Sequence, residues 1–526
     1  MAAPTRAACR LEGRNWFVRG FTTHDNAGGR DPKADGSYNL GFLGAFLQTQ
    51  IAPNFFVPVP TGGTRPGSYA ERYFGTYAAV YNQAYNANGR NADAAALTAR
   101  NAANANAPLL QPGTPEFAAA RDKIIHDPTP GQGARLILRS ILNEGSGQYT
   151  YRNNFADVTF GAAYRQFLLG SDGSLFEDTK DGDRIKNYEY GAYAQASKTL
   201  LDDHLKLAAA GRVDRFQNFG TAFSPRASVV YSLGADKDQN FRASFSRAFR
   251  APTQNDQYIR LDVGRAILLG NVSGGFQGYT SALGSQLATG QPVQFDSYQY
   301  SAAALKLEEV NSYEVGYRAQ FAKKLYVDVD YFYNTYNNFI ATQNFIGNID
   351  GSRPTPAQVA AAAPARFQSN ALPTRVIQIA ANVDQRVQSQ GAGITLSYAF
   401  APELTVSGNY SYNDLITKEF KVGTQSFFNT PRHKFNFGLD GRLLERALSY
   451  NVNYRWVDAF LYESTFATGT VPVAHTLDAQ VGYTLKSLHT TLQVGGTNLF
   501  DSANLQVYGA PSIGRIVYAG LLFDIK

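Results

Sequence analysis

The chain is poor in several residue types on which chemistry or folding often depends. Among its 526 residues are one Cys, one Met, 2 Trp and 6 His. The single cysteine, Cys9, excludes an internal disulfide and a cysteine-based zinc site. No stretch approaches the roughly 18 consecutive apolar residues of a membrane-spanning helix. Any membrane span must therefore be built from strands, because only helices and closed barrels satisfy their backbone hydrogen bonds in lipid.

Residue patterns for catalysis or metal binding are missing as well. The histidines have neither i,i+4 spacing nor a neighbouring cysteine, so they predict no metal site. They are His24, His126, His204, His433, His475 and His489. Ser232, Ser246 and Ser397 lack a G-x-S-x-G elbow, and Gly274-Gly275 lacks a following Gly-Lys-Ser/Thr. The sequence predicts no catalytic residue, no metal and no cofactor, and we do not expect an enzyme.

Charge is sparse and evenly spread. Charged residues make up 17% of the chain and the net charge is +6, yet Lys and Arg form no basic run. Nucleic-acid binding is therefore not expected. Aromatic residues are common, with 32 Tyr and 35 Phe, while the mean hydropathy is only −0.28. Alternating lipid-facing residues together with aromatic girdles give this mixture in membrane barrels.

The stretch from Tyr313 to Asn334 carries the clearest pattern in the chain. Tyr, Val, Ala and Phe alternate with polar residues over 313–321, and the alternation restarts after Lys323-Lys324. Two alternating arms around a short turn predict a β-hairpin with one apolar and one polar face. A soluble sandwich could use such a hairpin, but similar units recur along the chain, joined alternately by tight turns and long loops. Short turns at one rim, long loops at the other and an apolar outer band predict an antiparallel transmembrane β-barrel.

We therefore predict an all-β fold that fills the whole chain, residues 1–526. The first strand is expected at Asn15 to Asp25, followed by a large extracellular loop over 26–135. Within that loop, Thr114-Pro115 predicts the start of a helix that ends near Ile125. Counting arms gives about 16–18 strands, whereas barrels of transporter size have about 22. Further long loops are expected at 251–303, at 341–373, where Thr355-Pro356 opens a short helix, and between later hairpins.

Charged residues that alternate with lipid-type residues are expected to face the barrel lumen. Facing lipid would cost about 2–4 kcal/mol for Arg or Lys at mid-bilayer. The candidates are Arg165, Arg212, Arg242, Glu314, Arg318, Asp328 and Asp330. They could carry function, or they could merely hydrate the lumen or pair with a plug. Arg247 occupies a position in its strand where the alternation predicts an apolar residue. We therefore expect it near a rim, where a long side chain can reach the membrane interface.

Several segments resemble those of TonB-dependent outer-membrane receptors. Residues 245–253, FSRAFRAPT, resemble the YSRGFRAPS segment of that family, and 307–316, LEEVNSYEVG, resembles its PE…YELG segment. Thr497 to Asp501 with Tyr508 resembles NLFDKxY, and Gly514-Arg515 resembles the GR that opens the last strand. The motif positions are Phe245, Ser246, Arg247, Phe249, Arg250, Pro252, Tyr313, Glu314, Gly316, Asn498, Leu499, Phe500, Asp501, Gly514 and Arg515. Residues 15–48, with Phe17-Val18-Arg19 and Tyr38-Asn39-Leu40-Gly41, look like receptors of the Bacteroidetes type.

The resemblance also indicates what is missing. Such receptors begin with a signal peptide, a TonB-contacting box and a plug domain, and this sequence shows none of them, so we expect an N-terminally truncated receptor fragment. Phe523-Asp524-Ile525-Lys526 departs from the usual aromatic ending. By resemblance, the partners are outer-membrane lipid, the barrel-assembly machinery, an imported small ligand, and the TonB–ExbB–ExbD system through the missing N-terminal part.

Three functions follow as hypotheses. The first is TonB-dependent active uptake of a scarce solute of the siderophore, vitamin or glycan type across the outer membrane of a Gram-negative cell. The second is a passive porin-like or adhesive barrel. The third, an outer-membrane enzyme, is disfavoured because no catalytic constellation is present.

Overall fold

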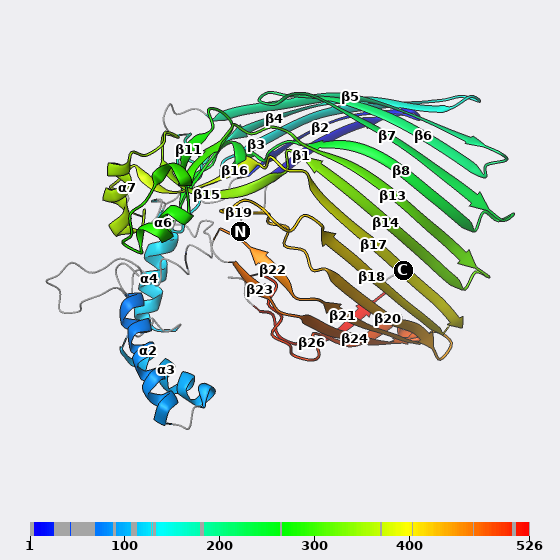
Figure 1. The fold of residues 1–526 in the computed structure, drawn as a ribbon. Coiled ribbons are helices and arrows are strands. Elements are labelled where there is room, and N and C mark those ends of the chain that lie inside the picture. The colour runs from blue at the N-terminus through cyan, green and yellow to red at the C-terminus, as the bar shows by residue number, and fades with distance from the viewer. Residues whose placement is uncertain are drawn as a thin grey trace.

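The computed structural model describes residues 5–25, 43, 69–87, 91–106, 113–127, 129, 133–178, 184–263, 266–368, 371–401, 403–465, 468–507 and 512–524. These residues form two large β-sheets of very different kind and a small two-stranded one. The first is a 17-stranded sheet of long strands that curves into a barrel wall, and the second is a 7-stranded sheet of short strands at one end of the wall (Figure 1). We call them the wall and the cap.

Long, alternating strands build the wall. Each wall strand pairs antiparallel with the next wall strand along the chain, from β1–β2 to β25–β26. The predicted all-β, antiparallel barrel architecture is confirmed. The strands are β1 (Thr5–Glu12), β2 (Trp16–His24), β3 (Ile141–Arg152), β4 (Asp157–Leu169), β5 (Ile185–Leu200), β6 (Leu205–Phe216), β7 (Gly220–Leu233), β8 (Gln239–Arg250), β13 (Glu308–Phe321), β14 (Leu325–Asn337), β17 (Val387–Ala401), β18 (Leu404–Leu415), β20 (His433–Leu443), β21 (Leu448–Val457), β24 (Ala474–Leu485), β25 (Thr490–Thr497) and β26 (Ile516–Phe523).

The central hairpin forms as the alternation predicts. Tyr313 lies opposite Tyr333, and Phe321 lies opposite Leu325 around the turn. Ala322 and Lys323 take left-handed backbone conformations there, with φ of 49° and 56°. This turn lies at one rim of the wall. The cap lies at the opposite rim (Figure 1).

The prediction that the first strand of the wall lies at residues 15–25 is wrong. The wall begins with β1, Thr5–Glu12, which pairs along its whole length with β2, so the strand expected at 15–25 is the second one. In β1 the apolar positions of the alternation are occupied by small residues, Ala7 and Cys9. The positions that alternate with them are Arg6, Ala8 and Arg10. Small side chains contribute little to an apolar face, so the pattern is weaker than in the central hairpin.

The cap occupies the long loops predicted at 251–303 and 341–373, for which the sequence indicated only the short helix after Thr355 and no strands. Its strands are β9 (Arg260–Asp262), β10 (Ile267–Leu269), β11 (Phe276–Thr280), β12 (Gln299–Ala302), β15 (Ile340–Asn348), β16 (Thr374–Asn382) and β19 (Thr424–Gln425). Most of them are three to five residues long, and β10 pairs parallel with β16 from a different loop. Two loops distant in sequence therefore fold as one body.

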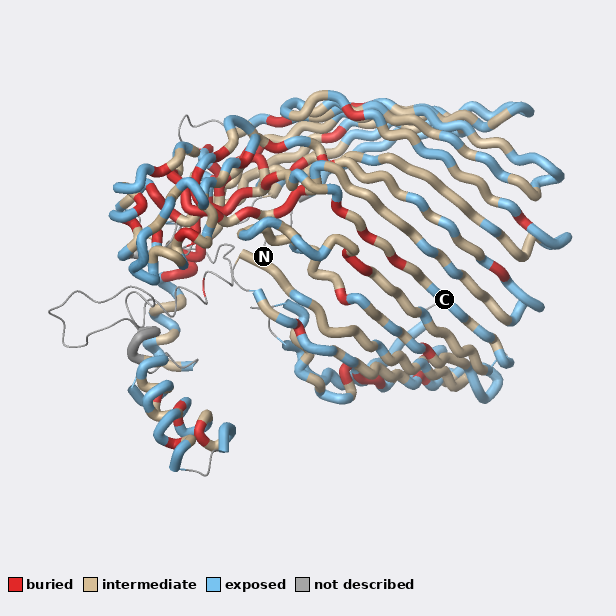
Figure 2. The backbone as a smooth tube through the Cα atoms, viewed as in Figure 1, coloured by how far each residue is buried: buried red, intermediate tan, exposed pale blue. Residues whose placement is uncertain are grey.

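Deep burial is concentrated in the cap (Figure 2). Phe345 and Ile377 are fully buried, and they pack with Phe276 and Ile379 in one hydrophobic cluster. Asn271 is also fully buried. Its side-chain amide donates hydrogen bonds to the carbonyl oxygens of Ala303 at 2.9 Å and of Ala380 at 3.1 Å, and so joins separate segments of the cap. The cap thus has a core and polar ties of its own.

Helices and short elements complete the described chain. The predicted helix after Thr114 is confirmed as α4 (Pro115–His126), with the Thr114 side chain accepting a hydrogen bond from the Phe117 amide, and Thr355 caps α7 (Pro356–Ala362) in the same way.

Most of 26–68, with the predicted 38–41 motif, lies outside the described residues, as do Tyr508 and 525–526. No described helix is long and apolar enough to cross a membrane. The remaining elements are α2 (Tyr69–Ala87), α3 (Ala92–Asn106), α5 (Gln254–Tyr258), α6 (Ala282–Leu287), β22 (Phe460–Glu463), β23 (Thr468–Val471) and three 3₁₀ turns at Phe295–Tyr298, Ala363–Ala365 and Lys486–Leu488.

The buried position of Phe345 predicts that one substitution loosens the whole cap. Phe345→Ala should destabilise it by about 3–5 kcal/mol, because the ring leaves a cavity in a packed core. Limited proteolysis of protein in lipid vesicles should then cut faster at sites in 266–305 as well as in 341–373. Val422→Ala, at a 67% exposed position, is the control and should not change the cleavage rate. Faster cutting confined to 341–373 would show that the two loops are independent.

Candidate functional site

One face of the wall carries a cluster of charges, which we call the Arg242 cluster: Arg242, Glu314, Arg318, Asp328 and Asp330. Asp328 accepts from both arginines, at 2.9 Å from Arg242 Nη1 and 2.8 Å from Arg318 Nε. Glu314 and Asp330 lie 3.6 and 3.8 Å from the Arg242 guanidinium. The residues come from β8, β13 and β14, which are hydrogen-bonded neighbours. The structure therefore gathers most of the predicted lumen-facing charges at one place.

Gly316 makes room for this cluster. It lies opposite Arg242 on β8 and Asp330 on β14. A Cβ atom at this position would stand only 2.6 Å from the Arg242 Cζ atom. The motif glycine is therefore explained by the guanidinium that lies across it.

Arg165 and Arg212 lie in two separate ion-pair groups on the same face. Arg165 bridges Glu144 and Glu189, its Nε atom lying 2.9 Å from Glu144 Oε2. Arg19 reaches the other oxygen of Glu144 at 3.0 Å. Arg212 pairs with Asp214 two residues along its own strand. The sequence analysis missed Glu144, Glu189 and Asp214. Each of them nevertheless occupies a position in its strand that alternates with the lipid-type residues, as the predicted lumen-facing charges do.

These groups form a polar face of the wall in which positive and negative charges offset one another. Every predicted lumen candidate has at least one oppositely charged neighbour. The described residues contain no group of three or more His, Cys, Asp or Glu side chains that could hold a metal ion.

The two longest family-like segments form a latch between β8 and β13, which we call the β8–β13 latch. Arg247 pairs with Glu309 at 2.6 Å, and Arg250 pairs with Glu308 at 2.7 Å. Glu308 is buried and also accepts from the Ile340 amide at 2.8 Å. The Arg247 pair lies within four residues of the cap-side end of β8. The latch joins the two strands on either side of the long 251–307 segment.

The other motif positions in these segments support the same joint. Phe245 packs on Tyr313 with ring centroids 5.2 Å apart. Ser246 lies opposite Ser312, and Phe249 lies opposite Glu309 with the Arg247 guanidinium over its ring. The Pro252 carbonyl oxygen accepts from the Gln257 side chain at 2.8 Å.

The motif near the end of the chain forms a second latch. The Asn498 side chain donates to the carbonyl oxygens of Ser502 and Ile513 and accepts from the Ser502 amide. The Arg515 amide donates to Asp501 at 2.8 Å, and Gly514 lies beside the same carboxylate. Leu499 donates its amide to Leu477 and its side chain lies over Gly496, whereas Phe500 packs edge-on against His475. These contacts fix the path from β25 to β26.

A cavity of about 440 Å³ lies between the cap and the inner face of the wall. We call it the vestibule. Its lining combines the Arg250–Glu308 pair with aromatic side chains, including Phe339 and Phe428. Tyr336 meets Phe339 edge-on at 5.7 Å, and Ser426 is held by a hydrogen bond to Glu463. An apolar cavity with a few fixed polar groups is the usual form of a ligand site.

Comparison with known proteins gives a consistent assignment. A family model described as "TonB dependent receptor-like, beta-barrel" matches residues 14–499. The iron-regulated outer membrane virulence protein of Vibrio cholerae is 25% identical over 340 residues, which cover 64% of this chain and 44% of that protein. The siderophore receptor PirA of Acinetobacter baumannii has a similar fold, with a TM-score of 0.50 at 15% identity over 73% of this chain and 55% of that one. The FrpB iron transporter of Neisseria meningitidis gives a TM-score of 0.50 at 14% identity, over 74% of this chain and 56% of that one. The chain thus spans about half the length of these relatives.

The geometry of the Arg242 cluster predicts energetic coupling across it. Arg242→Met and Asp328→Asn should each destabilise the wall by about 1–2 kcal/mol, because each leaves a partly buried charge with fewer partners. The double variant should lose less than the sum, and urea unfolding in lipid vesicles measures the difference. Lys323→Met, in the exposed turn before β14, is the control and should change nothing. Strictly additive losses would show that the two side chains are independent.

Proposed function

Because the chain belongs to the TonB-dependent receptor-like β-barrel family, we propose that it forms the barrel of an outer-membrane receptor that takes up a scarce solute by TonB-dependent active transport. Its relatives are outer-membrane proteins, and the family consists of transport receptors rather than enzymes. The whole chain, residues 1–526, would then serve as one barrel domain with elaborated outer loops, working with TonB–ExbB–ExbD through a further part of the receptor.

The vestibule is the observation that carries this proposal. It lies where a solute arriving from outside would meet the wall, under a cap built from the long loops. In barrels of this kind the long loops are extracellular and the short turns periplasmic. Loops held on a rigid scaffold commonly carry binding residues.

An iron–siderophore complex is the solute class that we propose. The support is the naming of its relatives, which include an iron-regulated outer-membrane protein, a siderophore receptor and an iron transporter. Aromatic side chains beside a fixed Arg–Glu pair suit a ligand that has both planar groups and polar atoms, because rings provide contact area while the ion pair orients hydrogen bonds.

Uptake of radiolabelled ferric siderophores tests the proposal. The intact receptor gene should restore saturable uptake to a receptor-deficient strain, and uptake should vanish when TonB is deleted. Linear, TonB-independent entry would instead indicate a passive porin. Surface attachment without any entry would indicate an adhesive barrel.

The vestibule assignment predicts a specific defect. Phe428→Ala should raise the KM for uptake about tenfold, because loss of a ring contact removes about 1–1.5 kcal/mol of binding. The maximal rate and the amount of receptor at the surface should stay unchanged. Leu444→Ala, in the exposed turn between β20 and β21, is the control. An unchanged KM for Phe428→Ala would place ligand binding elsewhere.

A further inference from the structure

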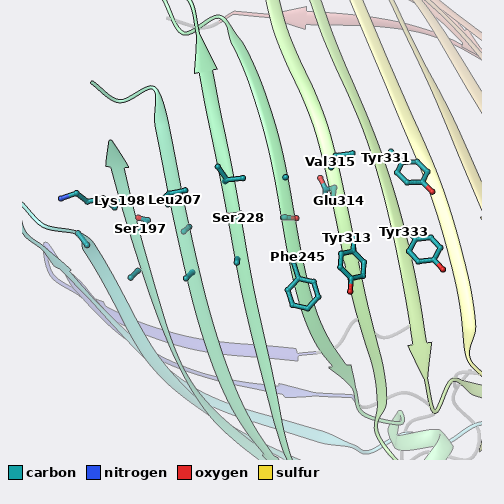
Figure 3. A pocket seen from close by; sticks show the side chains of 18 of the residues that line it. Ser197, Lys198, Leu207, Ser228, Phe245, Tyr313, Glu314, Val315, Tyr331 and Tyr333 are labelled. Carbon is teal, nitrogen blue, oxygen red and sulfur yellow. The ribbon is translucent and has the colours of Figure 1, made fainter. Parts of the chain in front are cut away.

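The outer face of the wall has a groove across β5, β6, β7, β8, β13 and β14, which we call the outer groove. Its volume is about 920 Å³ (Figure 3). Its floor follows one row of the sheet, in which small residues on three strands give way to rings on the next three. The row is Ala196, Ala209, Ala227, Phe245, Tyr313 and Tyr333, each opposite the next.

These side chains face away from the lumen. Within each strand they have the opposite parity to the charged clusters: Ala209 alternates with Arg212, and Tyr313 alternates with Glu314. Tyr313 is 52% exposed and Val315 is 54% exposed, as expected for side chains that meet lipid rather than a protein core. The outer groove is therefore open to the bilayer.

The outer groove rises from the rim of short turns toward the middle of the membrane. Ala196 lies four residues from Leu200, the last residue of β5 (200 − 196), whereas Tyr333 lies eight residues from Leu325, the first residue of β14 (333 − 325). The difference of four residues corresponds to about 13 Å along a strand. With strands tilted by about 40°, it corresponds to a rise of about 10 Å. That is close to half of the ~25 Å apolar band, or the depth of one leaflet.

A cation stands at the low end of the groove. Lys198 lies two residues from Leu200 and opposite Leu207 (Figure 3). Phe155 lines the groove beside it. Its ammonium donates to the Asn154 carbonyl oxygen at 3.1 Å and lies 4.9 Å from the centre of the Phe155 ring. Among the described residues no ion pair joins it to a carboxylate; its one hydrogen bond is to the Asn154 carbonyl oxygen, whereas an ammonium has three donors. It can therefore accept an anionic partner at the membrane surface.

We propose that the outer groove binds one anionic glycerophospholipid of the periplasmic leaflet. The phosphate lies at Lys198, and an acyl chain follows the alanine floor up to Tyr313 and Tyr333. The charge of Lys198 complements the headgroup, and the apolar lining and the one-leaflet rise suit the chain. This inference needs only the outer-membrane location and not the proposed uptake.

Native mass spectrometry of the purified protein in mild detergent tests the proposal. With added phosphatidylglycerol, one molecule should bind saturably, about tenfold more tightly than phosphatidylcholine. Lys198→Glu should remove that preference, whereas Lys324→Glu, on the same rim, should keep it. Inorganic phosphate should not compete, because it cannot fill the groove.

A bulky side chain placed inside the groove distinguishes a specific lipid site from non-specific adhesion of lipid to the outer face of the wall. Ala227→Phe should lower the affinity for both lipids about tenfold, whereas Ala519→Phe, on the outer face of β26, should not. If Ala227→Phe does not fold, Ala243→Phe in the same groove gives the same measurement. Equal lipid retention by Ala227→Phe and Ala519→Phe would overturn the proposal, as would an unchanged preference in Lys198→Glu.

Discussion

Every backbone amide and carbonyl group of the wall must find a partner within the protein, because the hydrocarbon of a membrane offers none. Within the described residues, the antiparallel ladder from β1 to β26 meets this demand for every strand that has a neighbour on each side, and the ladder in turn fixes register. Since the side-chain period is two, register decides which residues meet lipid and which face the lumen. The Arg242 cluster and the outer groove are thus two consequences of one pairing, on opposite faces of the same strands.

The two ends of the wall are built on different principles. At one end, residues with left-handed backbone such as Lys323 close tight turns. At the other, loops distant in sequence fold together around Phe345 and Asn271. Both latches lie toward this second end, where the chain leaves the regular ladder. The vestibule lies between the long, regular strands of the wall and the short strands and loops of the cap.

The wall was largely predictable from the sequence, and the cap was not. Alternation over nine or more residues, as at 313–321, is a local signal that identifies a strand and its faces. Cap strands of three residues, such as β10, carry no such period, and β10 pairs both with nearby β9 and with β16, which lies about a hundred positions further along the chain. β1 was missed for a related reason, since Ala7 and Cys9 mark an apolar face only weakly.

The candidate site shows the same division. Parity assigned Arg242 and Asp328 to the inner face, but only the register brings together two residues 86 positions apart. Gly316 could have been a signal, because an inward glycine between charged neighbours indicates space taken by a long side chain. The motif segments were recognised as a family feature, but nothing in their residues indicated that they are the two halves of one joint.

The β8–β13 latch has an evolutionary consequence. It holds neighbouring strands together at the base of residues 251–307, so the wall does not depend on what that segment contains. Loop closure costs little for added length, about 0.6 kcal/mol for each doubling. Segments of other lengths and compositions could therefore be exchanged there during evolution without redesign of the membrane-spanning part.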